Sequence, residues 1–253
     1  MRAVMTGIER VSRAGSRYVE LPAAGFAIDP DLEDPTRLLA VVYGEFADAI
    51  VADGVLRHYL GHVALPALSE AVTNVGFGRS SIFAVRPAVP GTESSDVQVR
   101  IAGLDDLDAI ARLSLVELRH RSTSPIFSVG DSRSHEQRGA EHRALVDRGA
   151  QHLIATLDGQ DVGLLTIELS SPAPRLCPDG EPYIGPTATL PAARRRGVGH
   201  ALVNAALHWA HRHGHRWVSV DFDPANPLSR PFWLGVGFRP TGYGVLRIID
   251  VGS

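Results

Sequence analysis

The fold of this chain is decided by the stretch Leu190-Pro191-Ala192-Ala193-Arg194-Arg195-Arg196-Gly197-Val198-Gly199-His200-Ala201. A strand-like run, 183–190, leads into it. A run with helical spacing leads out of it, because apolar residues recur at intervals of four, three and four positions: Val198, Leu202, Ala205 and Trp209. The arginines and glycines of the stretch therefore stand where a strand turns into a helix.

This turn predicts a binding site for phosphate groups. Glycines let backbone N–H groups approach a ligand closely, and the first turn of a helix carries unpaired N–H donors and partial positive charge. Such a turn favours anions, above all phosphates. The spacing is neither that of a P-loop, which also needs a lysine, nor that of the dinucleotide motif G-x-G-x-x-G. Nucleotide hydrolysis and dinucleotide binding are therefore disfavoured.

The stretch resembles a family signature, because Arg194-x-x-Gly197-x-Gly199 matches the acyl-CoA motif [QR]-x-x-G-x-[GA] of the GNAT acyltransferase superfamily. Residues 226–238 are similar to the second motif of that family, N-x-x-A-x-x-F-Y-x-x-x-G-F, with Ser229 in the alanine place and Trp233 in the tyrosine place. The resemblance covers roughly residues 97–250. It implies an α/β fold of the GNAT type, in which helices flank a mixed central sheet.

The resemblance also implies acetyl-CoA as the acyl donor, without a metal. It assigns the CoA pyrophosphate to the turn residues Arg194, Arg195, Arg196, Gly197, Val198, Gly199 and His200. It assigns the pantetheine arm to the strand residues Ala188, Thr189 and Leu190, and places Asn226 and Trp233 near that arm. The Leu190 N–H is expected to donate to the thioester oxygen as the oxyanion donor.

Two further groups are needed for acetyl transfer, a base for the acceptor and an acid for the leaving thiolate. Glu168, near the end of the preceding strand, is the expected base, and a solvent-facing edge residue is the alternative reading. Asp221 and Asp223 are second candidates. An indole cannot protonate a thiolate at neutral pH, so Trp233 leaves that step to water or to Tyr243.

The first part of the chain predicts a degenerate copy of the same fold. Val75-Gly76-Phe77 pairs with Val236-Gly237-Phe238 at an offset of 161 residues, which also places Pro66 on Pro227. At that offset the counterpart of the phosphate turn is 33–38, which has no glycine and carries two carboxylates. We therefore expect a GNAT-like region without CoA at 1–90, a linker at 91–96 and a catalytic domain at 97–253. The alternative to a repeated fold is that helices and strands alternate in the same order in both halves by coincidence.

The composition limits the partners and the compartment. The net charge is −3, which does not indicate a nucleic-acid-binding protein. All 25 basic residues are arginine, which excludes a lysine nucleophile. The single cysteine, Cys177, and the lack of a signal-like or membrane-length apolar run predict a soluble, cytoplasmic protein. The histidines between 200 and 215 favour a solvated helix end over a metal site.

The acceptor is not specified by the sequence. The family most often acetylates amines, so a small-molecule amine or a protein N-terminus is expected, and a homodimer is an open alternative. Ile126 and Phe127, in the long loop before the helix expected at 134–147, are candidate acceptor contacts, or else pack under that loop. A non-catalytic acyl-CoA-binding or regulatory protein is the competing class, because the family tyrosine is missing at Trp233.

Overall fold

A computed structural model describes residues 7–11, 17–21, 34–63, 66–91, 96–123, 125, 135–171 and 177–250. Its contacts divide the chain into two compact units. Unit 1 runs to Phe83 and also includes Phe222–Pro224 and the residues from Pro240 onward, whereas unit 2 comprises Ala84–Asp221 and Ala225–Arg239. Strand β4 (Gly78–Pro87) has residues in both units.

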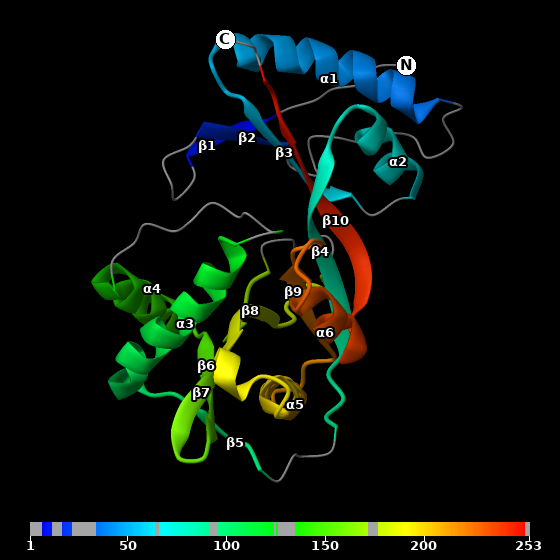
Figure 1. Ribbon diagram of the computed structural model, residues 1–253. Coiled ribbons are helices and arrows are strands. Elements are labelled where there is room, and N and C mark those ends of the chain that lie inside the picture. The colour runs from blue at the N-terminus through cyan, green and yellow to red at the C-terminus, as the bar shows by residue number, and fades with distance from the viewer. Residues whose placement is uncertain are drawn as a thin grey trace. The chain divides into compact units, whose positions relative to one another are not determined.

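Unit 1 is a sheet with two helices (Figure 1). Its strands lie in the order β1-β2-β3-β10-β4. The elements besides β4 are β1 (Ile8–Val11), β2 (Arg17–Leu21), α1 (Pro35–Ala52), β3 (Arg57–Val63), α2 (Pro66–Asn74) and β10 (Arg239–Ile248). β10 pairs with β3 in antiparallel fashion, and the register shifts between Tyr243 and Val245.

Helix α1 covers the core of unit 1. It begins at Pro35, because the Asp34 side chain accepts the Arg37 N–H at 2.9 Å. The buried side chains are Leu39, Tyr43, Leu60, Val63, Ala71, Val72, Phe77 and Val245. The Tyr43 hydroxyl is 2.7 Å from Nδ1 of His58, so this polar pair is satisfied inside the core.

Unit 2 contains a mixed sheet with the strand order β4-β9-β8-β7-β6-β5. The strands from β5 to β8 pair in antiparallel fashion, and β8 runs parallel to β9. The elements in chain order are β5 (Gln98–Ile101), η2 (Leu104–Asp106), α3 (Leu107–Arg121), α4 (His135–Asp147), β6 (Gln151–Leu157), β7 (Gln160–Glu168), β8 (Tyr183–Thr189), η3 (Pro191–Ala193), α5 (Val198–Arg212), β9 (Trp217–Phe222) and α6 (Ser229–Gly235).

Helices α3 and α5 cover opposite faces of this sheet. A Cβ built at Gly163 of β7 would lie 2.7 Å from the Val198 side chain of α5. The next residue, Leu164, packs instead with Ile110 and Leu113 of α3. Because successive strand residues point to opposite faces, the two helices lie on different sides. Figure 1 shows α4 beside α3, and the two helices are in contact. The mixed sheet with flanking helices confirms the predicted fold class.

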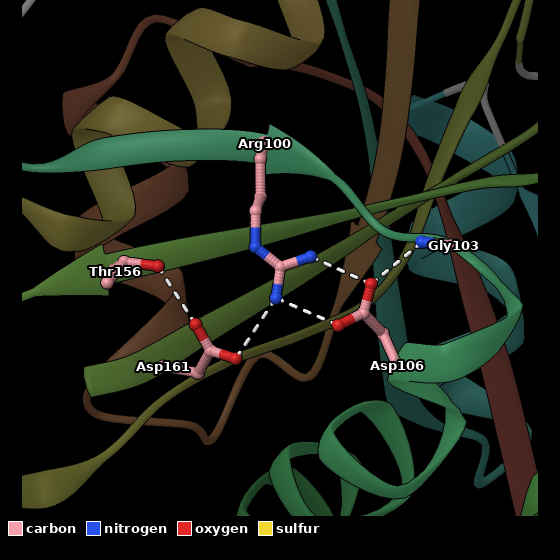
Figure 2. Close-up of polar contacts among 5 residues, drawn as sticks. All are labelled: Arg100, Gly103, Asp106, Thr156 and Asp161. Carbon is pink, nitrogen blue, oxygen red and sulfur yellow. Dashed lines mark hydrogen bonds and ion pairs between the residues drawn. The ribbon is translucent and has the colours of Figure 1, made fainter. Parts of the chain in front are cut away.

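An ionic network fixes the edge strand β5 and the start of α3 (Figure 2). The Arg100 guanidinium donates to both carboxylate oxygens of Asp106, at 2.7 and 2.9 Å, and to Asp161 at 3.2 Å. Asp106 also accepts the Gly103 N–H at 2.8 Å, and Asp161 accepts the Thr156 hydroxyl at 2.9 Å. This arrangement holds the beginning of α3 against three strands, and α3 carries side chains of the site below.

Elements of the two halves of the chain recur at the offset of 161 residues. β4 spans 78–87 and β10 spans 239–248, which are the same bounds shifted by 161. Arg86 donates to the Val236 carbonyl at 2.5 Å, and Arg247 donates to the Val75 carbonyl at 2.6 Å. Gly76 and Gly237, which follow those carbonyls, have φ values of 92° and 95°. The same turn and the same arginine contact therefore occur in each unit, and each contact joins residues from both halves of the sequence.

Candidate functional site

The turn between β8 and α5 has the backbone shape of an anion cradle. η3 follows β8, and the chain then takes left-handed conformations at Arg195 (φ 62°) and Gly197 (φ 82°). α5 begins at Val198 with Gly197 as its N-cap, and no side chain caps its first turn. The N–H groups of that turn are therefore directed past the helix end, where a phosphate can accept them.

The three arginines of the turn differ in their surroundings. Arg194 is half-buried, and its Nε donates to the Thr189 carbonyl at 3.4 Å. Arg196 is exposed and forms an ion pair of 2.9 Å with Asp158 in the β6–β7 hairpin. Arg195 is exposed as well. Exposed ion pairs contribute little to stability, so Arg196 can exchange Asp158 for a phosphate at small cost.

Gly199 allows the turn to pack closely on α6. A Cβ at this position would lie 3.0 Å from the ring of Phe232. His200, which is exposed, has its ring edge-on to Phe232 with centroids 5.6 Å apart. Trp233, the neighbour of Phe232, is only 4% exposed and packs edge-on against Phe238. Trp233 is therefore packed in the protein interior.

The strands β8 and β9 separate to form a fork. Their paired residues are Tyr183↔Ser219 and Ile184↔Val220, and beyond Ile184 the described part of β8 has no partner in β9. On its other edge β8 stays paired with β7 as far as Thr189↔Gly163. The open edge of β8, from Gly185 to Thr189, thus offers backbone groups to an extended ligand arm.

The register of β8 corrects the predicted oxyanion donor. The Leu190 N–H donates to the Val162 carbonyl at 2.8 Å, so it points toward β7 and is already bonded. N–H groups alternate along a strand, and those of Thr187 and Thr189 therefore point to the open edge. The Leu190 N–H is therefore not open to the ligand as the sequence predicted, because sequence alone does not give the strand register.

Glu168 lies at the mouth of the fork. It is the last residue of β7 and stands opposite Tyr183 in the β7–β8 ladder. Its carboxylate occupies the space beside Gly185, where a Cβ would overlap the Oε1 atom. β8 holds one residue more than β7 between the pairs Leu165↔Thr187 and Ile167↔Ile184, so a bulge falls at Gly185-Pro186. A glycine followed by proline inside a strand was the signal available for this feature.

Tyr183 and Asp221 form a hydrogen-bonded pair beside Glu168. The Tyr183 hydroxyl donates to an oxygen of Asp221. Burial, followed by the nearby Asp221, raises the pKa of Tyr183, and burial also raises the pKa of Asp221 against the opposing hydrogen bond from Tyr183. Glu117 of α3 is close to the same group: burial raises its pKa, and Arg121, 3.3 Å away, lowers it. Sequence reasoning missed Tyr183 and Glu117.

Other predicted residues lie elsewhere or have other contacts. Oδ1 of Asn226 accepts the Leu228 and Ser229 N–H groups, both at 3.0 Å, and is 3.2 Å from Nε2 of His120, so Asn226 contacts both the residues at the start of α6 and α3. Tyr243 belongs to unit 1, where the Arg79 guanidinium lies 4.0 Å from its ring centre. Ile126 and Phe127 lie outside the described residues.

Comparison with known proteins identifies the family. Residues 113–238 match the model of the Acetyltransferase (GNAT) family. Aminoglycoside N(6')-acetyltransferase type 1 from Klebsiella aerogenes is 32% identical over 111 residues, which cover 43% of this chain and 73% of the relative. The chain belongs to the GNAT family, and membership implies acetyl transfer from acetyl-CoA.

Solved structures support the fold. The GCN5-related N-acetyltransferase from Sphaerobacter thermophilus aligns with a TM-score of 0.66 at 15% identity, covering 99% of this chain and 78% of that one. A tandem GNAT protein from the clavulanic acid biosynthesis pathway aligns with a TM-score of 0.57 at 15% identity, covering 99% of this chain and 80% of that one.

In the described residues, no helix combines the length and apolar character required to cross a bilayer.

Proposed function

We propose that this protein transfers the acetyl group of acetyl-CoA to an amine by direct attack on the thioester. The observation that carries the proposal is the left-handed turn at Arg195–Gly197, placed at an uncapped helix start directly after the forked strand β8. Arg194–His200 would hold the pyrophosphate through backbone N–H groups and guanidinium groups. The open edge of β8 at Ala188 and Thr189 would hold the pantetheine arm.

The chain's own groups supply the remaining steps. A backbone N–H of β8 that faces the open edge, Thr187 or Thr189, would donate to the thioester oxygen as negative charge develops there. Glu168 would take a proton from the acceptor's ammonium group. The amine lone pair then forms the C–N bond, the C–S bond breaks, and the nitrogen loses its second proton to water as it becomes an amide. The thiolate takes a proton from water, since a thiol of pKa about 8.5 needs no strong acid.

The acceptor is proposed to be a cationic amine. The curated relative is named for acetylating an aminoglycoside, and the carboxylates of Glu117, Glu168 and Asp221 gather on the α3 side of the fork. Negative groups there would attract a positively charged acceptor. A panel of kanamycin, spermidine and a peptide with a free amino terminus covers small amines and protein N-termini.

Turnover of acetyl-CoA on this panel, followed by mass spectrometry of the products, tests the proposal. We expect an acceptor heavier by one acetyl group, and Glu168→Gln should lower kcat by about 100- to 10,000-fold while acetyl-CoA affinity stays the same. Gly139→Ala, in α4 with no atom near its added Cβ, is the control for handling and expression. Tight acetyl-CoA binding without transfer would instead indicate a non-catalytic acyl-CoA-binding protein.

We also propose that the two halves form a tandem repeat whose first copy does not bind CoA. The offset of 161 residues shared by β4 and β10 and by the two arginine contacts supports this reading. At the start of α1, the Asp34 carboxylate already accepts the Arg37 N–H, in the place where a phosphate would have to bind. A carboxylate there would also repel a pyrophosphate.

A further inference from the structure

Three side chains of neighbouring strands share one face at the mouth of the fork. Tyr183 stands directly opposite Glu168 in the β7–β8 ladder, so the two side chains point to the same face. Tyr183 is also paired with Ser219 in β9, and Asp221, two residues further on, points to the face of Ser219. The hydrogen bond between Tyr183 and Asp221 confirms that they meet there.

Asp221 is placed at the point where the strands part. The pair Ile184↔Val220 is the last one between β8 and β9. The next residues are Gly185 on β8, which leaves room for the Glu168 carboxylate, and Asp221 on β9. The carboxylates of Glu168 and Asp221 therefore lie where β8 and β9 begin to separate, and the Asp221 carboxylate accepts a hydrogen bond from the Tyr183 hydroxyl.

We propose that Tyr183 is a positioning residue, which fixes Asp221 so that its carboxylate holds the ammonium group of the acceptor while Glu168 takes the proton. This inference rests on the proposed acetyl transfer and gives the two carboxylates separate roles. The hydroxyl of Tyr183 occupies one lone pair of Asp221 and leaves the other carboxylate oxygen for the acceptor. A charge-assisted hydrogen bond to a fixed carboxylate orients the amine for attack.

Several titratable groups surround Asp221. Glu117, His120 and Arg121 of α3 face the site, and Glu168 and Cys177 lie near Tyr183. Burial raises the pKa of Asp221 overall, and the hydroxyl of Tyr183 and Arg121 oppose this shift by favouring the carboxylate. Removal of the Tyr183 hydroxyl removes one group that favours the carboxylate form. Asp221 should then need a higher pH to ionise.

Steady-state kinetics with the panel amine of highest kcat/KM tests the inference. Tyr183→Phe and Asp221→Asn should each raise the KM for that amine by about 10- to 100-fold, which corresponds to loss of a hydrogen bond to a charged group. The KM for acetyl-CoA should not change. Glu168→Gln should instead lower kcat. In Tyr183→Phe, the pH at which the acceptor KM improves should move upward, because ionisation of Asp221 is shifted.

Tyr18→Phe, which removes a tyrosine hydroxyl in unit 1, is the matched control and should leave all constants unchanged. An active wild type whose acceptor KM and pH dependence are unaffected by both Tyr183→Phe and Asp221→Asn would overturn this inference alone. A wild type that transfers acetyl to no panel amine would overturn the proposed function together with it. Circular dichroism and acetyl-CoA calorimetry on each variant verify folding, and the isosteric Asp221→Asn keeps the test decisive if Tyr183→Phe does not fold.

Discussion

Gly185 keeps open the space that the Glu168 carboxylate fills. A methyl group at Gly185 would overlap the end of that flexible side chain, so Glu168 would turn away while the backbone stays in place. Gly185→Ala should therefore reduce kcat by about 100-fold or more, as expected for a displaced base, and leave the melting temperature within a few degrees. The rate and a thermal melt are the measurements, with Gly139→Ala as control. A variant of full activity would show that Glu168 is not the base.

Asp221 links the site to stability. Its folded pKa is raised by burial, so its contribution to stability is full below the unfolded value of 3.8 and is lost as the pH rises through the folded value. Asp221→Asn cannot ionise. It should therefore melt at a higher temperature than the wild type near about pH 8, and the difference should shrink toward about pH 4. A difference that grows toward acid pH would contradict the direction of the shift.

The residues of the site differ in how far sequence can predict them. The turn between β8 and α5 could be predicted because its signal is local: three consecutive arginines are followed directly by Gly197 and, after Val198, by Gly199. The strand pairing and its register decide where the Tyr183 and Asp221 side chains and the open N–H groups lie. Local sequence patterns do not specify that pairing. The bonded state of the Leu190 N–H has the same origin, because a shift of one residue turns every N–H to the other edge of a strand.

Among the secondary-structure elements, β4 and β10 are each fixed by an arginine that donates a hydrogen bond to a backbone carbonyl. Arg86 in β4 binds the Val236 carbonyl and Arg247 in β10 binds the Val75 carbonyl. Arg86→Met and Arg247→Met should each lower the free energy of unfolding by about 1.5–3 kcal/mol, the usual value for a hydrogen bond to a charged group. Urea unfolding measures this, with exposed Arg112→Met as control. Equal losses in all three variants would mean that the contacts contribute nothing specific.

The order of strands was the part of the fold that sequence did not reveal. Local patterns predicted the strand at 183–190, the helix that begins at Val198 and the helix at 134–147, which correspond to β8, α5 and α4. They gave no sign that β10 lies between β3 and β4 in unit 1, because that pairing joins segments about 180 residues apart and has no local signal.

At the scale of the whole molecule, unit 1 needs the end of the chain. Val245 of β10 is buried in its core, and β10 pairs with β3. A chain ending at Arg239 should therefore lose protection of 57–63 from hydrogen exchange, although those residues are far upstream. Exchange measured on this variant and on the full chain gives the answer. Unchanged protection would show that the first half folds on its own.

The acetyl-CoA stoichiometry is a second property of the whole chain. One cradle with left-handed residues occurs in the described residues, at Arg195–Gly197, and its counterpart at Asp34 carries a carboxylate. We expect calorimetry to give one acetyl-CoA per chain. Two molecules per chain, at similar affinity, would contradict the proposal that the first copy lacks CoA.

Binding of acetyl-CoA by the turn from Arg194 to Gly199 underlies the proposed function, and calorimetry on Gly197→Glu is the test of this binding. Gly197 has φ 82°, a conformation that disfavours any side chain, and glutamate adds a negative charge at the phosphate position. We expect measurable binding of acetyl-CoA to the wild type and none to Gly197→Glu, while circular dichroism shows both proteins folded. Unchanged affinity in Gly197→Glu would show that acetyl-CoA does not bind at this turn.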